Sequence, residues 1–127
     1  MRNGAFTLVA GSVAALVLAV SMAAASRVVT IGSRLRIKSS ALTFSGTVSS
    51  SKAACRQGRK VTLYRAPSLV LGSSRTSAPG HWRVTVSGSA GITLGHFYAR
   101  VSKRSEGTAG TIYVCAPARS NTVPYKP

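Results

Sequence analysis

The stretch Ser77–Val86, SAPGHWRVTV, decides the fold that we expect for this chain. It holds the single Trp of the sequence, Trp82, between His81 and Arg83. Its Pro-Gly pair is a strong turn signal, and apolar residues alternate with polar ones after it. An alternation of period two indicates a β-strand with one buried face. We therefore expect Trp82 in the core and His81 and Arg83 on the opposite face, so the three do not form one site.

The rest of the chain after Ser26 repeats this pattern, and no stretch has the periodicity of an amphipathic helix. Short runs rich in Val, Thr, Ile and aromatic residues are separated by Ser, Gly and Pro, which is typical of strands and turns. The runs lie in 41–50, 59–65, 68–72, 96–104 and 111–118, in addition to the stretch quoted above. About seven short strands in roughly 100 residues predict an all-β fold, an antiparallel immunoglobulin-like or transthyretin-like β-sandwich.

Residues 26–40 form a basic segment whose structure the pattern leaves open. Leu35 and Ile37 alternate with Arg and Lys residues, which is consistent with a short edge strand. A linker preceding the domain is the alternative. We therefore divide the chain into a leader, residues 1–25, a basic N-terminal segment or linker, residues 26–40, and a β-sandwich domain, residues 41–127.

The N-terminus, MRNGAFTLVAGSVAALVLAVSMAAAS, is typical of a signal peptide with a hydrophobic helix. Arg2 supplies the positive start, an apolar stretch follows, and the small residues ending at Ala25 fit a cleavage site. The alternative is an uncleaved membrane anchor, because the uncharged run approaches the ~20 residues that span a bilayer. Either reading predicts a secreted or extracytoplasmic protein associated with the cell envelope.

Cys55 and Cys115 are the only cysteines, and an even count in a small exported chain predicts a disulfide. The bond would close a loop of about sixty residues, and on the chain-entropy model it would contribute roughly 4 kcal/mol. Strict alternation places Cys115 beside Tyr113 on the less apolar face of its strand. We therefore expect the bond to fasten a loop to an outer face, unless a bulge reverses the parity.

The composition excludes much chemistry. The chain has 17 Lys and Arg, no Asp and one acid, Glu106, which we place in a turn within SKRSEGTAG. General acid–base catalysis by paired carboxylates and the binding of calcium or magnesium both need more acids than this. The two His and two Cys lack the close spacing of a zinc site. We therefore expect no catalytic residue, no cofactor and no metal.

The motifs also resemble those of a known family. Gly46-Thr47-Val48, Val61-Thr62-Leu63, Thr76 with Gly80-His81-Trp82-Arg83-Val84, and Phe97-Tyr98-Ala99-Arg100-Val101 are similar to the strands of the carboxypeptidase regulatory-like domain. The similarity covers residues 42 to 117. It implies a transthyretin-like, prealbumin-type sandwich and a non-catalytic accessory, spacer or adhesion role. It carries over no functional residues. The turn before Gly80 lacks the acid common in that family, and the Cys pair is an addition.

The net charge of +16 at neutral pH favours an anionic partner. We expect an anionic envelope polymer or membrane surface, bound through charge neutralisation and counterion release. The candidate contacts are outward-facing basic residues: Lys60, His81, Arg83, Arg100, Lys103 and Arg104. One alternative is nucleic-acid binding with base stacking on Tyr64 and Tyr98, although export argues against a specific nucleic-acid partner. Another alternative is an enzyme inhibitor or accessory domain.

Overall fold

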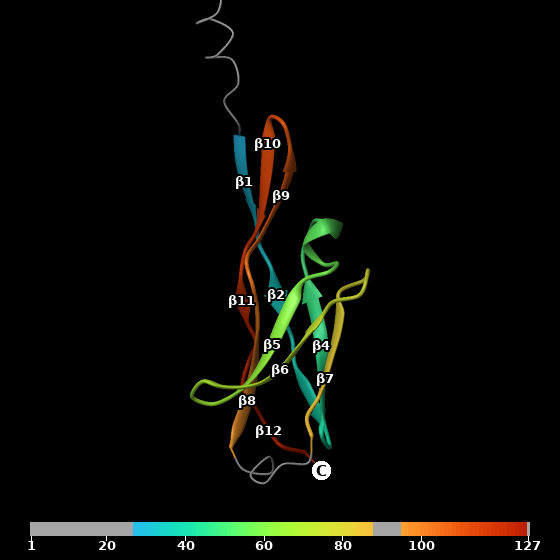
Figure 1. The fold of residues 1–127 in the computed structure, drawn as a ribbon, viewed down its shortest axis with the longest axis vertical. Coiled ribbons are helices and arrows are strands. Elements are labelled where there is room, and N and C mark those ends of the chain that lie inside the picture. The colour runs from blue at the N-terminus through green and yellow to red at the C-terminus, as the bar shows by residue number, and fades with distance from the viewer. Residues whose placement is uncertain (1–26, 88–94, 127) are drawn as a thin grey trace, which may run out of the picture.

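The computed structural model describes residues 27–87 and 95–126, and this part of the chain is almost entirely β-structure (Figure 1). The predicted signal peptide, residues 1–25, and most of the Gly-rich connection after Ser87 lie outside the described residues. The strands are β1 (Arg27–Ile31), β2 (Arg34–Leu35), β3 (Lys38–Ser40), β4 (Thr43–Ser49), β5 (Lys60–Arg65), β6 (Leu69–Arg75), β7 (His81–Thr85), β8 (His96–Val101), β9 (Arg104–Thr108), β10 (Thr111–Cys115), β11 (Ala118–Arg119) and β12 (Val123–Pro124). A short 3-10 turn, η1 (Ala53–Cys55), precedes β5.

Two antiparallel sheets enclose one hydrophobic core. One sheet has the strand order β11-β8-β5-β6, with β12 also paired to β8. The other has the order β2-β4-β3, with β7 also paired to β4. Both sheets contribute to a single cluster of buried side chains, which includes Phe44 and Trp82 from the second sheet and Leu63 and Phe97 from the first. The rings of Phe44 and Phe97 meet across the core, with centroids 4.8 Å apart.

A third sheet extends the molecule at one end (Figure 1). Here β1 pairs in parallel with β10, and β10 pairs antiparallel with β9. In sequence, β1 leads into β2 and β3, β8 leads into β9, and β10 leads into β11 and β12. Twelve strands of the described residues thus arise from about seven extended runs of chain, some of which pass from one sheet to another.

The alternation around Trp82 is confirmed. Trp82 and Val84 are buried, whereas His81 and Arg83 are exposed on the opposite face of β7. The indole Nε1 of Trp82 donates a hydrogen bond of 3.3 Å to the carbonyl oxygen of Arg36. Arg36 lies between β2 and β3, where the interruption of the strand makes this carbonyl available. The only Trp of the sequence therefore has a structural role.

The basic N-terminal segment forms strands β1, β2 and β3. Leu35 and Ile37 are buried in the core cluster, and β2 and β3 pair with β4 along one edge of its sheet. The edge-strand reading of this segment therefore describes the structure, and the linker reading does not.

One sequence-based expectation about the strands is corrected. Glu106 lies in strand β9, paired with Tyr113, and not in a turn. The turn follows at Ala109-Gly110, where the positive φ of Gly110 (114°) suits glycine. The polar residues of SKRSEGTAG show no apolar alternation that would indicate a strand. The reason is that β9 belongs to the narrow third sheet and not to the core.

Gly46 leads to a first testable prediction. A Cβ at this position would overlap the carbonyl oxygen of Arg36 and lie 3.0 Å from Nε1 of Trp82. We expect Gly46→Ala to destabilise the domain by about 1–3 kcal/mol, the usual range for overpacking a core. Urea unfolding would measure this loss. Gly32→Ala is the matched control, since a Cβ there meets no atom within 4 Å. Equal midpoints for both variants would contradict the prediction.

Candidate functional site

The predicted disulfide joins η1 to the end of β10. The Sγ atoms of Cys55 and Cys115 are bonded, and their Cα atoms lie 5.3 Å apart. Neither residue has any exposed surface. The expectation that the bond reaches an outer face is therefore wrong, because η1 and the end of β10 cover each other. The pair lies outside the main core cluster and forms a second buried centre at the junction with the third sheet.

Arg59 lies beside this disulfide and is 1% exposed. Its Nη1 donates to the carbonyl oxygen of Cys55 (2.7 Å) and to Oγ of Ser33 (3.1 Å). Its Nη2 donates to the carbonyl oxygens of Ser102 (2.8 Å) and Ala116 (3.0 Å). These acceptors belong to four different connections, so one guanidinium ties together the chain crossings between the sheets. Burial lowers the pKa of Arg59, and the nearby charge of Arg104 lowers it further.

The outer side of the sheet that contains β4 and β7 forms a basic surface, which we call the groove face. Across the strands, Lys38 pairs with Ser45, which pairs with Arg83. In the neighbouring rows Thr47 pairs with His81, and Ser49 pairs with Arg34. The backbone of Arg36 donates to the carbonyl of Thr47, which places its exposed side chain between these rows. The groove face comprises Arg34, Arg36, Lys38, Ser45, Thr47, Ser49, His81 and Arg83.

An open groove of about 680 Å³ runs along one end of the groove face. It is lined by two arginines and by five hydroxyl-bearing residues, with one glycine: Gly32, Ser33, Arg34, Arg36, Thr47, Ser49, Ser50 and Ser51. Guanidinium groups bind phosphate and carboxylate through paired N–H donors, and hydroxyls add further hydrogen bonds. The only acid of the chain, Glu106, lies elsewhere in β9. The groove is therefore chemically suited to an anion.

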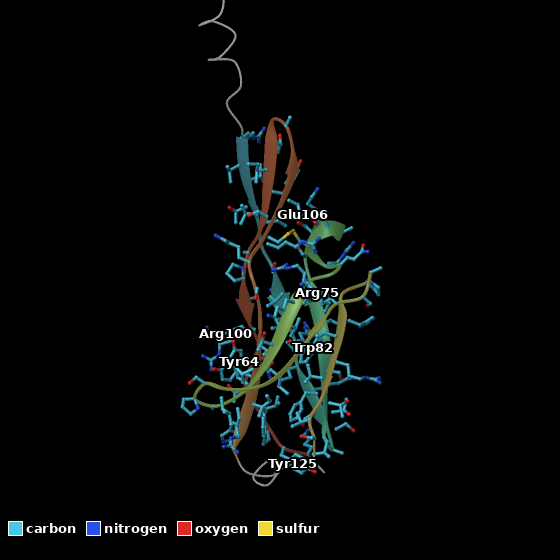
Figure 2. The ribbon with its side chains drawn as sticks, in the orientation of Figure 1. Tyr64, Arg75, Trp82, Arg100, Glu106 and Tyr125 are labelled. Carbon is cyan, nitrogen blue, oxygen red and sulfur yellow. A yellow bond between two sulfur atoms is a disulfide. The ribbon has the colours of Figure 1, made fainter. Side chains whose placement is uncertain are left out.

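The outer side of the other sheet forms a second basic surface, which we call the tyrosine face. Tyr64 and Tyr98 pair across β5 and β8, and their rings are stacked, with centroids 5.1 Å apart. The guanidinium of Arg119 lies 3.9 Å from the ring centroid of Tyr98. Figure 2 shows Tyr64 and Arg100 together on this side of the molecule. The tyrosine face comprises Lys60, Tyr64, Arg75, Tyr98, Arg100 and Arg119.

The six predicted contact residues do not form one patch. His81 and Arg83 lie on the groove face, whereas Lys60 and Arg100 lie on the tyrosine face. The other two lie where β8 leads into β9: Lys103 is exposed, and Arg104 is half-buried. Arg104 forms an ion pair with Glu106 (2.7 Å) and donates to the carbonyl of Gln57 (2.7 Å).

Sequence reasoning did not place Arg34, Arg36 and Lys38 on one surface with His81 and Arg83. The signal was present, because the alternation with Leu35 and Ile37 already placed these three side chains on a solvent face. Interpreting residues 26–40 as a possible linker leaves these three residues out of the surface that contains His81 and Arg83.

Base stacking on Tyr98 has no structural support. Tyr98 is 2% exposed, and it is contacted by Tyr64 from β5 and by Arg119 from β11, the strands on its two sides. Both faces of its ring are therefore occupied, and a nucleobase has no open surface to stack on.

Within residues 27–87 and 95–126, His, Cys and acidic side chains form no group of three or more that would hold a metal ion. The described part of the chain also contains no helix with the length and hydropathy needed to cross a membrane.

Comparisons with protein-family models, with curated proteins and with solved structures give no match for this chain. The similarity of its motifs to the carboxypeptidase regulatory-like domain stays a prediction.

Proposed function

We propose that this protein is an exported, non-catalytic β-sandwich module that binds anionic polymers of the cell envelope through its groove face. The observation that carries the proposal is the groove itself, in which Arg34 and Arg36 lie among hydroxyl groups. Lys38, His81 and Arg83 extend the same surface across the sheet. A flat row of cations and hydroxyls suits a repeating polyanion better than a compact small molecule.

The strand order supports an immunoglobulin-like sandwich as the fold. Counted as extended runs, the first, second and fifth share one sheet, and the seventh, sixth, third and fourth share the other. In immunoglobulin-type domains, too, the first, second and fifth strands lie in one sheet and the third, sixth and seventh in the other. Here the fourth run lies in the sheet of the third.

The disulfide supports an extracytoplasmic location. Disulfides persist in oxidising compartments and are rare in the cytosol. Cys55 and Cys115 are both buried within the bond and leave no free thiol in the chain. An envelope polymer would meet the protein in the same compartment.

Binding through the groove face would depend strongly on salt. Each cation that neutralises a polymer phosphate releases condensed counterions, so affinity falls as the salt concentration rises. Removing one phosphate contact reduces the magnitude of the logarithmic salt slope by about one. The slope therefore counts the cations that touch the polymer.

A second prediction tests this proposal with the chain Ser26–Pro127, which contains every described strand, and long-chain polyphosphate as the probe. We expect the double variant Arg34→Gln/Arg36→Gln to bind at least tenfold more weakly at ~0.15 M salt, and its salt slope to fall by about two. Fluorescence anisotropy with labelled polyphosphate would measure both quantities.

The matched control removes the same charge elsewhere. Arg27 and Lys126 are exposed and lie on neither basic face, so Arg27→Gln/Lys126→Gln should lose much less affinity. Equal losses in the two double variants would show that net charge alone governs binding, and the groove would have no special role. Two single-stranded DNAs of unlike sequence should bind equally well, since the proposal includes no base readout. A marked preference for one of them would favour the nucleic-acid alternative.

A further inference from the structure

The hairpin between β5 and β6 exposes two large apolar side chains. Leu69 is 51% exposed and Val70 is 59% exposed, and both begin strand β6. In Figure 1 this hairpin projects sideways from the body of the sheets. Val70 pairs with Tyr64, which pairs with Tyr98, so an apolar and aromatic row crosses three strands of the tyrosine face. Leu69 pairs with Arg65 and therefore lies on the other side of the projecting hairpin.

Two hydrogen bonds fix the β5–β6 hairpin to strand β8. The hydroxyl of Tyr98 donates a hydrogen bond of 2.6 Å to the carbonyl oxygen of Pro67, in the connection between β5 and β6. The backbone N–H of Ala66 donates to the carbonyl of His96, at the start of β8. The apolar tip is thus tied to β8 at two points, and little further ordering is needed when it meets a partner.

Basic residues share the tyrosine face with this apolar row: Arg100 and Arg119 lie in the next row, and Lys60 and Arg75 lie at the other end of β5 and β6. Lys60, Arg75, Arg100 and Arg119 are exposed on the tyrosine face. A hollow of about 250 Å³ lies between β8 and β11, bordered by Arg100 and Arg119 with apolar residues at its base.

From this combination we propose that the β5–β6 hairpin and the tyrosine face dock on a lipid bilayer that contains anionic phospholipids. The projecting hairpin enters the boundary between headgroups and acyl chains with Leu69 on one side and Val70 on the other, while Arg100 and Arg119 neutralise lipid phosphates. Of the two tyrosines only Tyr64 has surface left to meet the bilayer, because Tyr98 is buried. A half-buried tyrosine is suited to this depth, since its ring is apolar and its hydroxyl polar.

Charge decides against the other obvious occupant, a second copy of this chain. A symmetric contact through the tyrosine face would bring two sets of four cations together, with no acid on either side. An anionic bilayer supplies both the missing negative charge and an apolar layer.

The groove face lies on the other sheet and points away from this surface, so the module would hold envelope polymer close to the membrane.

The inference rests on residues that the proposed polymer site does not use, so the membrane proposal and the polymer proposal can fail separately.

A third prediction uses the chain Ser26–Pro127 with vesicles of phosphatidylcholine alone or with about one third phosphatidylglycerol. We expect sedimentation with the anionic vesicles only. Leu69→Ser/Val70→Ser should weaken binding to the anionic vesicles about tenfold, because the variant lacks the apolar side chains that the bilayer would remove from water. Val28→Ser/Ile112→Ser is the matched control, since these apolar residues are also exposed but lie in the third sheet.

Depth of insertion can be measured directly. Leu69→Trp should be quenched by lipids brominated on the acyl chains, whereas Val28→Trp should not. The native Trp82 is buried between the sheets and gives an unquenched background in both variants.

Three results would overturn the proposal. The first is unchanged vesicle binding by Leu69→Ser/Val70→Ser together with no quenching of Leu69→Trp. The second is complete competition by soluble glycerophosphate, which would indicate a phosphate site without insertion. The third is self-association that Leu69→Ser/Val70→Ser abolishes in the absence of vesicle binding. In each case Arg34→Gln/Arg36→Gln would still report separately on the polymer site.

Discussion

Replacing Arg59 with Met is expected to remove a large part of the domain's stability, about 3–5 kcal/mol, because three backbone carbonyls would lose their donor. The side chain is fully buried and donates to three backbone carbonyls and one serine hydroxyl. Met has a similar length but no donor, so the carbonyls of Cys55, Ser102 and Ala116 would lose these bonds. Each buried acceptor that is left without a donor costs about 1–3 kcal/mol. Part of this loss is offset, because the variant no longer buries a charged guanidinium.

Denaturant unfolding monitored by the buried Trp82 would measure this loss. Arg83→Met makes the same chemical change at an exposed position and should shift stability by no more than about 0.5 kcal/mol. Arg59→Lys should also destabilise, because one ammonium cannot reproduce the fork that reaches four acceptors. A midpoint for Arg59→Met close to that of Arg83→Met would show that the hydrogen bonds of Arg59 do not stabilise the fold.

Removing the disulfide is expected to have a comparable effect. The bond closes a loop of 60 residues, for which the chain-entropy model gives roughly 4 kcal/mol. Cys55→Ala/Cys115→Ala should therefore unfold at a much lower denaturant concentration than the oxidised chain. The parent chain measured under a reducing agent should approach the same midpoint. Unfolding midpoints that do not depend on oxidation would contradict the prediction.

Arg59 and the disulfide should not act independently. Cys55 supplies both a sulfur to the bond and a carbonyl acceptor to Arg59. Losing the disulfide frees η1 and thereby weakens that hydrogen bond. The combined variant should consequently lose less stability than the two separate losses together, as expected for groups in one network.

The sequence was informative where a local pattern decides structure. Alternation placed Trp82 and Val84 inside and His81 and Arg83 outside, because side-chain direction in a strand follows from position alone. The cysteine count predicted the disulfide for a similarly simple reason. These features need no knowledge of which strands are neighbours.

The features that the sequence did not reveal depend on which strands are neighbours. Arg59 looks like any other basic residue before a strand, and its burial arises only where four connections converge. Glu106 lies among polar residues, yet it forms a strand because β10 pairs with it. The groove face required the knowledge that Lys38 and Arg83 lie on either side of Ser45. Local periodicity contains no information on such pairings.

The pairing of β1 with β10 has a consequence for the time at which the protein can fold. Arg27 to Ile31 pair with Thr111 to Cys115, which follow 84 residues later in the chain. Contacts between distant parts of a chain form slowly, since a long loop must close first. During synthesis β1 stays without its partner until the residues of β10 have been added. The third sheet is therefore among the last parts to assemble.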